Sequence, residues 1–338
     1  MSTGNQPDWR TKPHHDQSPT VIGNSKNVWK WSKEDGFDLT HPPTPNSDPV
    51  DSHLRLQYAT TPVIIEPVKT ALLIIDLQNY DLHEALGNDN PEFSRAEAVV
   101  LKFAIPAARE RDIQIIWITT GYSDEDLEEM DSDIFKTFNF QPVVSPDWQK
   151  RPPGAGWNTK GMYRNAKGVG DEIGEVTDKN GKVIDAGRML VKGSWNSWLH
   201  DPLSDAYDEG QMASPPDVHF YTNRSSGMWD TMMDVTTIVH EHNLRTLLFT
   251  GINIDQCDMG TLQDAYLKGF DTILLGDCCA TDSPSYAQWS VEHNCMVSWG
   301  FLSSCKDLAA GSGLEVDDAS QEGVPAPKTA WCLLEGNG

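Results

Sequence analysis

The stretch LLFTGINIDQCDMGTLQDAYLKGFDTILLGDCCAT, residues 247–281, decides the fold class. An apolar run ends at residue 252, within the segment 245–252. Over 259–269 the apolar residues recur at helical spacing, and a second apolar run spans 271–280. Continuous apolar runs of this length are typical of strands that are covered on both faces of a sheet. Two such strands joined by a helix predict a βαβ unit with parallel strands.

The same alternation of strands and helices extends along most of the chain. The patterns predict strands at 71–79, 113–120, 218–223, 245–252, 271–280 and 296–302, and helices at 94–112, 229–243, 259–269 and 284–294. We therefore expect an α/β protein, with three layers (α/β/α) around a six-stranded, mainly parallel sheet of the Rossmann-like type. In such folds the active site lies at the carboxyl ends of the strands.

Composition divides the chain into three parts. Residues 1–66 form an N-terminal extension without sustained periodicity, residues 67–308 form the main domain, and residues 309–338 form a C-terminal tail. Within the main domain, 121–187 is a long polar stretch that we interpret as an insertion or lid. The extension carries Trp29, Trp31 and Phe37, so we expect it to pack on the domain or on a neighbouring subunit.

Charge and hydropathy limit the partners. The chain of 338 residues has a formal net charge of −24, which argues against nucleic acid as a partner. The mean hydropathy is −0.48, and no apolar run is long enough for a transmembrane helix. The sequence begins without the apolar core of a signal peptide, so we expect a cytoplasmic protein with no membrane partner.

All six cysteines lie in the last quarter of the chain, and no two of them form a CxxC pair. This spacing is typical neither of a zinc ribbon nor of a secreted disulfide framework. We therefore expect reduced thiols, with the adjacent Cys278 and Cys279 serving as buried packing.

Two strand ends carry reactive groups. Asp76 ends the first apolar run, where an unpaired charge is costly, although a capping aspartate also fits this position. Cys257 follows the fourth strand at the beginning of a helix, whose free N–H groups and dipole favour a thiolate. For Cys257, a buried structural cysteine is the alternative. Arg224, just after the third main strand, is a strong cation near these ends.

Four segments together resemble the isochorismatase-like cysteine hydrolases, and within that superfamily the ureidoacrylate amidohydrolases. They are ALLIIDLQN (71–79), VKGSWNSWL (191–199), RSSGMWDT (224–231) and the stretch 247–281. The resemblance covers roughly residues 67–305. It implies that Cys257 is the nucleophile and that Asp76 is the general base. It also implies an oxyanion hole formed by the backbone N–H groups of Asn253 and Cys257, with a cis peptide between Ile252 and Asn253.

The chain departs from the family pattern at the catalytic lysine. Alignment on the third main strand puts Thr222 where the lysine is expected, and the nearest upstream lysine, Lys192, matches a structural position. Three outcomes stay open. Arg224 supplies the cation, or the Asp76–Cys257 pair works alone on a more activated substrate, or the protein has turned to another reaction or to binding.

Further residues near the strand ends are candidates for substrate binding. The set combines aromatic, amide, hydroxyl and glycine positions, which suit a small planar carbonyl compound. Its members are Gln78, Asn79, Tyr80, Trp195, Thr222, Arg224, Ser226 and Gly227. Asp81 and His83 have a D-x-H spacing that some relatives use for a metal, but no second histidine follows closely, so we expect no metal and no other cofactor.

The sequence therefore predicts a cysteine-dependent hydrolase that cleaves C–N bonds of a small amide, ureido or carbamoyl substrate through a thioester. The alternative is a non-hydrolytic family member, an isomerase, lyase or binding protein, that has lost the lysine. The resemblance also implies a homo-oligomer, either a dimer or a tetramer.

Overall fold

The structure is a computed structural model that describes residues 19–24, 27–42, 52–57, 61–144, 159–229 and 234–316. Its centre is a six-stranded sheet in the order β12-β7-β6-β13-β14-β15. The strands are β6 (Thr70–Ile75), β7 (Gln114–Thr120), β12 (Val218–Thr222), β13 (Thr246–Ile252), β14 (Asp271–Ala280) and β15 (Phe301–Ser303). Every pair of neighbouring strands is parallel, which confirms the predicted α/β class. The sheet was predicted to be mainly parallel, and it is entirely parallel.

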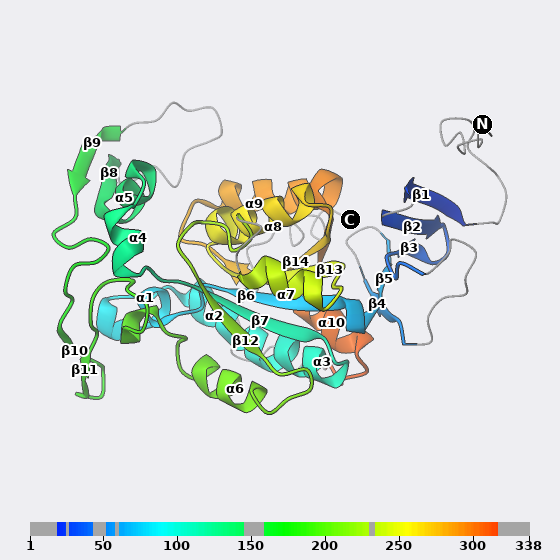
Figure 1. Cartoon of the computed structure of the whole chain (residues 1–338), viewed down its shortest axis with the longest axis horizontal. Helices are drawn as coiled ribbons and strands as arrows, with labels where there is room; N and C mark the ends of the chain where they lie inside the picture. Colours follow the sequence, from blue (N-terminus) through cyan, green and yellow to red (C-terminus); the bar gives the residue numbers. More distant parts are fainter. Residues whose placement is uncertain are drawn as a thin grey trace.

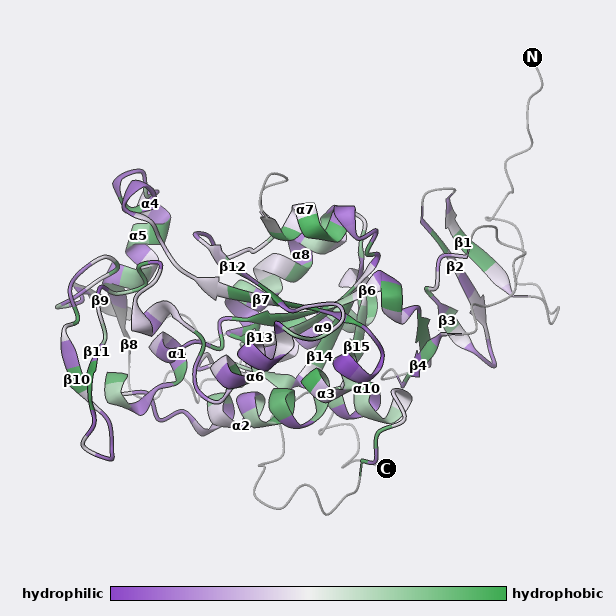
Figure 2. Ribbon diagram, turned by 60° about the horizontal axis from the view of Figure 1, so that its bottom comes forward, coloured by the Kyte–Doolittle hydropathy of each residue, from purple (hydrophilic) through white to green (hydrophobic). Residues whose placement is uncertain are grey.

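Helices cover both faces of this sheet (Figure 1). One face is covered by α2 (Pro91–Val99), α3 (Ile105–Glu110), α6 (Leu203–Gly210) and α10 (Cys305–Gly311). The other face is covered by α7 (Asp234–Glu241), α8 (Met259–Leu267) and α9 (Ser285–Asn294). All residues of β6, β7 and β13 are buried, as expected for strands between two helical layers. Figure 2 shows these strands as the hydrophobic centre of the molecule.

The end of the main domain differs from the prediction. The sixth strand was expected at 296–302, but Cys295–Trp299 continues α9 as a π-helical turn, and the strand β15 is confined to Phe301–Ser303. The expected tail begins inside α10, which packs against the helix layer and β14. The strand was misassigned because a short apolar run has no period long enough to separate strand from helix.

The described part of residues 1–66 forms a sheet of its own. Its five strands, in the order β1-β2-β3-β5-β4, are β1 (Thr20–Asn24), β2 (Asn27–Ser32), β3 (Gly36–Asp38), β4 (Leu54–Leu56) and β5 (Val63–Ile65). Trp29 and Phe37 lie against Phe301 of β15, with ring centroids 5.5 and 5.3 Å away. The Trp29 indole N–H also donates to Asp271 at 2.8 Å. The extension therefore packs on the domain, one of the two arrangements that its aromatic residues predict.

The polar stretch 121–187 is structured where it is described. It contains α4 (Asp124–Glu128), α5 (Ser132–Asn139), the antiparallel pair β8 (Phe140–Val144) and β9 (Thr159–Arg164), and the antiparallel pair β10 (Glu175–Thr177) and β11 (Val183–Asp185). These elements lie together at one end of the molecule, beyond the carboxyl ends of β6 and β7 (Figure 1).

One expectation about the cysteines is wrong. Cys278 of β14 and Cys305 at the start of α10 form a disulfide, although reduced thiols were predicted. The two residues are 27 positions apart and meet because α10 packs beside the end of β14, a contact that sequence spacing does not reveal. Cys279 is buried packing, as expected. Across the described ranges, no helix has the length and apolarity needed to cross a membrane.

Candidate active site

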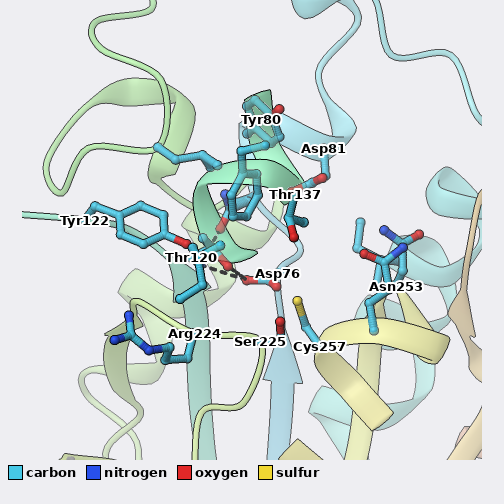
Figure 3. Close-up of a pocket in the computed structure, with 16 residues that line it drawn as sticks. Asp76, Tyr80, Asp81, Thr120, Tyr122, Thr137, Arg224, Ser225, Asn253 and Cys257 are labelled. Atoms are coloured by element: carbon cyan, nitrogen blue, oxygen red, sulfur yellow. Dashed lines mark hydrogen bonds between the residues drawn. The ribbon is translucent and has the colours of Figure 1, made fainter. Parts of the chain in front are cut away.

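A pocket opens at the carboxyl ends of the central strands (Figure 3). Asp76 follows β6, Thr120 ends β7, and Asn253 and Cys257 follow β13. Neighbouring parallel strands end at the same edge of a sheet, so these four residues meet although up to 181 positions of sequence separate them. With its open mouth included, the pocket has a volume of about 600 Å³.

Asp76 is held in an unusual backbone conformation at the bottom of this pocket. Its φ is 54°, in the left-handed region that non-glycine residues seldom adopt. The side chain is buried, and its Oδ1 accepts hydrogen bonds from Thr120 N at 2.8 Å and Thr120 Oγ1 at 3.0 Å. Burial raises the pKa of Asp76 to about 6, while hydrogen bonds from Cys257 and Thr120 oppose the rise. At neutral pH the carboxyl is therefore mostly ionised and able to accept a proton.

Cys257 faces this carboxylate. Its thiol is hydrogen-bonded to Asp76 and lies on the π-helical turn Ile254–Asp258, which continues directly into α8. Among the free cysteines that the structure describes, Cys257 is partly exposed, whereas Cys279 and Cys295 are buried. Burial and the nearby negative charge of Asp76 raise the pKa of the Cys257 thiol well above its usual range. The resting group is therefore a thiol, not a stored thiolate.

Asn253 connects β13 to this helical turn. The peptide between Ile252 and Asn253 is cis, as the family resemblance implied. The Asn253 carbonyl accepts a hydrogen bond from Gln256 N at 3.0 Å, and its side-chain Oδ1 accepts one from Asp282 N at 3.2 Å. These bonds fix the turn on which Cys257 lies, so the sulfur and the backbone at Asn253 keep a defined geometry.

Six of the predicted site residues line the pocket, and ten further residues complete its wall. The predicted ones are Asp76, Gln78, Tyr80, Arg224, Asn253 and Cys257. The others are Asp81, Thr120, Tyr122, Ile134, Thr137, Phe138, Leu190, Ser225, Ile252 and Gln256.

Asn79 and Trp195, predicted to bind substrate, are absent from this wall. Asn79 is buried, and its Nδ2 donates to the carbonyl of Trp195 at 2.9 Å and to that of Leu199 at 3.3 Å. The Trp195 ring packs edge-to-face on His83 at 4.7 Å. The two residues therefore join the first strand end to the 195–199 segment.

Ser226 and Gly227 are absent from the wall as well. Ser226 Oγ accepts a hydrogen bond from Met228 N at 3.0 Å. Gly227 N donates to Thr261 Oγ1 at 3.0 Å, and a Cβ at this glycine would meet Ile118 at 2.9 Å. Both residues pack the chain between β12 and α8, and their polar groups are used there.

The lysine position contains a buried threonine that is also outside the pocket wall. Thr222 Oγ1 lies within hydrogen-bond distance of the carbonyls of Arg224, at 3.1 Å, and Ser226, at 3.2 Å. Lys192 pairs with Asp126 at 3.1 Å and does not line the pocket either. In the described ranges, Arg224 is the one lysine or arginine on the wall.

Arg224 is already engaged. Its guanidinium donates to Asn223 O at 3.0 Å and to Asp131 at 3.2 Å, and it lies 5.1 Å from the centre of the Trp229 ring. Figure 3 shows this group on the far side of the pocket from Cys257. The leading influences on the Cys257 pKa all raise it, and none of them is a cation.

Gln78 presents a donor without a partner. Its Oε1 accepts a hydrogen bond from Thr120 N at 2.8 Å. This bond fixes the orientation of the side-chain amide, because the backbone N–H of Thr120 must face Oε1 and not Nε2. The Nε2 is buried and has no hydrogen-bond partner among the described residues. A buried donor that lines a pocket in this way suits an acceptor atom of a ligand.

Asp81 and His83 of the D-x-H pair have different surroundings. Asp81 lines the pocket, and burial raises its pKa well above the usual range. His83 accepts a hydrogen bond from Ala85 N at 3.1 Å and packs on Trp195. Within the described residues, the three side chains whose potential metal-ligand atoms lie close together are Asp277, Cys278 and Cys305. The two sulfurs of this group are bonded to each other.

Several pocket residues were missed from the sequence. Thr120 could have been found, because it is the polar end of a predicted strand next to that of Asp76 in the sheet. The α5 residues Ile134, Thr137 and Phe138 carry no comparable signal, because they come from the polar stretch whose path is set by tertiary packing.

Comparisons with known proteins show which sequences this chain is similar to. The isochorismatase domain family matches residues 186–295. The ureidoacrylate amidohydrolase RutB of Stutzerimonas stutzeri (strain A1501) is 25% identical over 274 residues, which cover 79% of this chain and 93% of that protein. RutB of Enterobacter sp. (strain 638) is 25% identical over 250 residues, with 73% and 90% covered.

A solved structure shows the same fold. The cysteine hydrolase from Pseudomonas syringae pv. phaseolicola 1448A superposes with a TM-score of 0.51 at 12% identity, over 79% of this chain and 98% of that one. The domain match and the curated relatives confirm the resemblance found in the sequence: residues 186–295 match the isochorismatase domain family, and most of the chain is similar to ureidoacrylate amidohydrolases.

Proposed function

We propose that the chain is a cysteine-dependent hydrolase that cleaves a C–N bond in a small amide, ureido or carbamoyl compound through a thioester. The observation that carries the proposal is the hydrogen bond between the Cys257 thiol and the Asp76 carboxylate at the bottom of an open pocket. The relatives named as ureidoacrylate amidohydrolases support the same bond type.

The chemistry begins with the thiol. As the Cys257 sulfur bonds to the substrate carbonyl carbon, its proton passes to Asp76, whose pKa of about 6 suits a base at neutral pH. The carbonyl oxygen becomes an oxyanion, which the backbone N–H groups of Asn253 and Cys257 stabilise. Asp76 then returns the proton to the leaving nitrogen as the C–N bond breaks, and a thioester remains on Cys257.

Water completes the cycle. Asp76 takes a proton from a water molecule, the resulting hydroxide bonds to the thioester carbon, and the C–S bond breaks. The proton held by Asp76 then returns to the sulfur, which restores the thiol–carboxylate pair. No lysine enters these steps, so proton transfer during the attack replaces a stored thiolate.

A second candidate is a non-hydrolytic protein on the same scaffold. The observations that favour it are Thr222 at the lysine position and the raised pKa of Cys257. A cytoplasmic location and a homo-oligomer stay predictions from the sequence.

The test is ammonia release over a panel of ureido acids, biuret, nicotinamide and simple aliphatic amides. We expect turnover of at least one compound, and a loss of at least about 10⁴-fold in Cys257→Ala, because the nucleophile is removed. Mass spectrometry of the quenched wild type should show an acyl adduct on Cys257.

The matched control is Cys279→Ala, which removes a buried thiol outside the pocket and should keep activity within about threefold. Hydrolysis that survives Cys257→Ala would contradict the thioester route. A wild type that releases no ammonia from any compound would favour the non-hydrolytic candidate.

A further inference from the structure

Tyr122 is held rigidly beside the proposed catalytic pair. It lies two residues beyond β7, and its backbone N–H donates to Leu190 O at 2.8 Å, while its carbonyl accepts from Lys192 N at 2.9 Å. Its ring packs edge-to-face on Phe138 of α5 with centroids 6.0 Å apart, and the side chain is 1% exposed. Both the backbone and the ring are therefore fixed, which limits the directions that the hydroxyl can take.

The hydroxyl points into the pocket, toward Asp76 (Figure 3). Burial, followed by the charges of Cys257 and Asp76, raises the pKa of Tyr122 far above its usual value, so the group stays a neutral O–H donor at working pH. Figure 3 places Tyr122 and Asn253 on opposite sides of the pair. A group bound at the sulfur would therefore lie between the phenol and the backbone at Asn253.

This hydroxyl makes no hydrogen bond within the described part of the chain. Buried tyrosine hydroxyls normally find one, because an unpaired buried polar group costs free energy. Other groups near the missing lysine have partners: Thr222 Oγ1 meets backbone carbonyls, and the Arg224 guanidinium meets Asn223 O and Asp131. The pocket is therefore where the Tyr122 hydroxyl can meet a hydrogen-bond partner.

We propose that Tyr122 is a catalytic residue that donates a hydrogen bond to the substrate, on the side opposite the Asn253 backbone. The inference rests on the proposed hydrolase function and adds to it a neutral donor in a site without lysine. The substrate then carries an acceptor oxygen or nitrogen next to the scissile carbonyl, which the phenol holds while Cys257 attacks.

The test is Tyr122→Phe, which keeps the ring packing on Phe138 and removes the hydroxyl. With the best substrate of the panel, we expect KM to rise about tenfold while kcat stays within about threefold, because the lost bond is present both before and during the reaction. The acid limb of the pH profile should keep its position. A purely structural role would lower the melting temperature without this split between KM and kcat.

Tyr221→Phe is the matched control. This tyrosine lies on the neighbouring strand β12, outside the pocket wall, and its hydroxyl accepts a long bond of 3.4 Å from Gly193 N. Its KM should stay within about twofold. An unchanged KM in Tyr122→Phe, or an equal rise in Tyr221→Phe, would overturn the proposal.

A second measurement does not depend on turnover. Iodoacetamide carries an amide that the phenol can hold, whereas methyl methanethiosulfonate reacts with the same sulfur and has no carbonyl. We expect Tyr122→Phe to slow alkylation of Cys257 by iodoacetamide about fivefold and to leave the thiosulfonate reaction unchanged. If the wild type hydrolyses nothing, the proposed function fails and this comparison decides the role of Tyr122. Equal effects on both reagents would reject it.

Discussion

Two carboxyl–thiol pairs lie close together in this molecule, and only one of them faces the pocket. The open pair is Asp76 and Cys257, and the sealed pair is Asp258 and Cys279. In both pairs the acid is buried, and burial together with the neighbouring carboxyl raises the pKa of the thiol well above its usual range. The sealed pair has both side chains buried and lines no part of the pocket described above.

The acids also differ. Asp76 receives two hydrogen bonds from Thr120, whereas neither oxygen of Asp258 receives an N–H or O–H donor among the described residues. Burial raises the pKa of Asp258 to about 8, and the weak S–H donor of Cys279 lowers it only partly. At neutral pH Asp258 is mostly protonated and Asp76 mostly ionised. The comparison shows that access and the donors around the acid, rather than acid–thiol proximity, distinguish the pair that we propose as reactive.

Replacing the acid of each pair should give the largest difference in activity between the two pairs. Asn tolerates the left-handed conformation at position 76, so Asp76→Asn removes the base with little backbone strain. We expect kcat/KM to fall about 10³-fold in Asp76→Asn and to stay within about threefold in Asp258→Asn. Steady-state kinetics with one substrate checks both variants. Comparable losses in the two would mean that the sealed pair takes part in the reaction.

Thiol labelling should give the next largest difference. Cys257 is partly exposed, whereas Cys279 and Cys295 are buried, so we expect labelling of Cys257 by iodoacetamide to be about 10²-fold faster. Its absolute rate should stay below that of a free cysteine at pH 7, because the pKa of its thiol is raised. Peptide mass spectrometry over a time course measures the three rates. Labelling of Cys279 at the same rate would show that the sealed pair opens in solution.

Titration of the two acids should affect different measured quantities, the rate for Asp76 and the stability for Asp258. The base at Asp76 must be ionised, so kcat/KM should fall about tenfold per pH unit below its pKa of about 6. A rate that stays flat down to pH 4.5 would remove Asp76 from the role of base.

Asp258 should appear in stability instead. Its folded pKa of about 8 lies above the ordinary value of 3.8, so its contribution to stability is fully present below pH 4 and is lost as pH rises through 8. Relative to Asp258→Asn, the unfolding free energy of the wild type should fall by up to ~1.4 kcal/mol per pH unit in this window. Urea unfolding at several pH values measures the difference. Parallel stability curves for the two proteins would contradict the raised pKa.

The sequence predicts the open pair because its members end strands. Apolar runs identify β6 and β13, and parallel strands bring Asp76 and Cys257 to one edge of the sheet. The same rule does not find Asp258, because a carboxyl that follows the nucleophile on a helix gives no sign of the side to which it turns. The disulfide between Cys278 and Cys305 was missed for a similar reason, since it depends on how α10 packs.

The pocket wall is the part that sequence reasoning describes least well. Asn79, Trp195, Ser226 and Gly227 lie in the motifs that mark the superfamily, yet their polar or backbone groups support neighbouring segments. Tyr122 and the α5 residues, by contrast, reach the pocket from a polar stretch without helical or strand periodicity. Their contribution depends on long-range packing, which a local pattern does not encode.

The aromatic contact of Trp29 and Phe37 with Phe301 has a practical consequence for shortening the chain. β15 is the outer strand of the central sheet, and a chain that started at residue 67 would leave Phe301 without its two aromatic neighbours. An uncovered edge strand with a bare phenylalanine invites aggregation. The strands that carry Trp29 and Phe37 are therefore best treated as a cover for the sheet margin, to be kept whenever the chain is trimmed for expression.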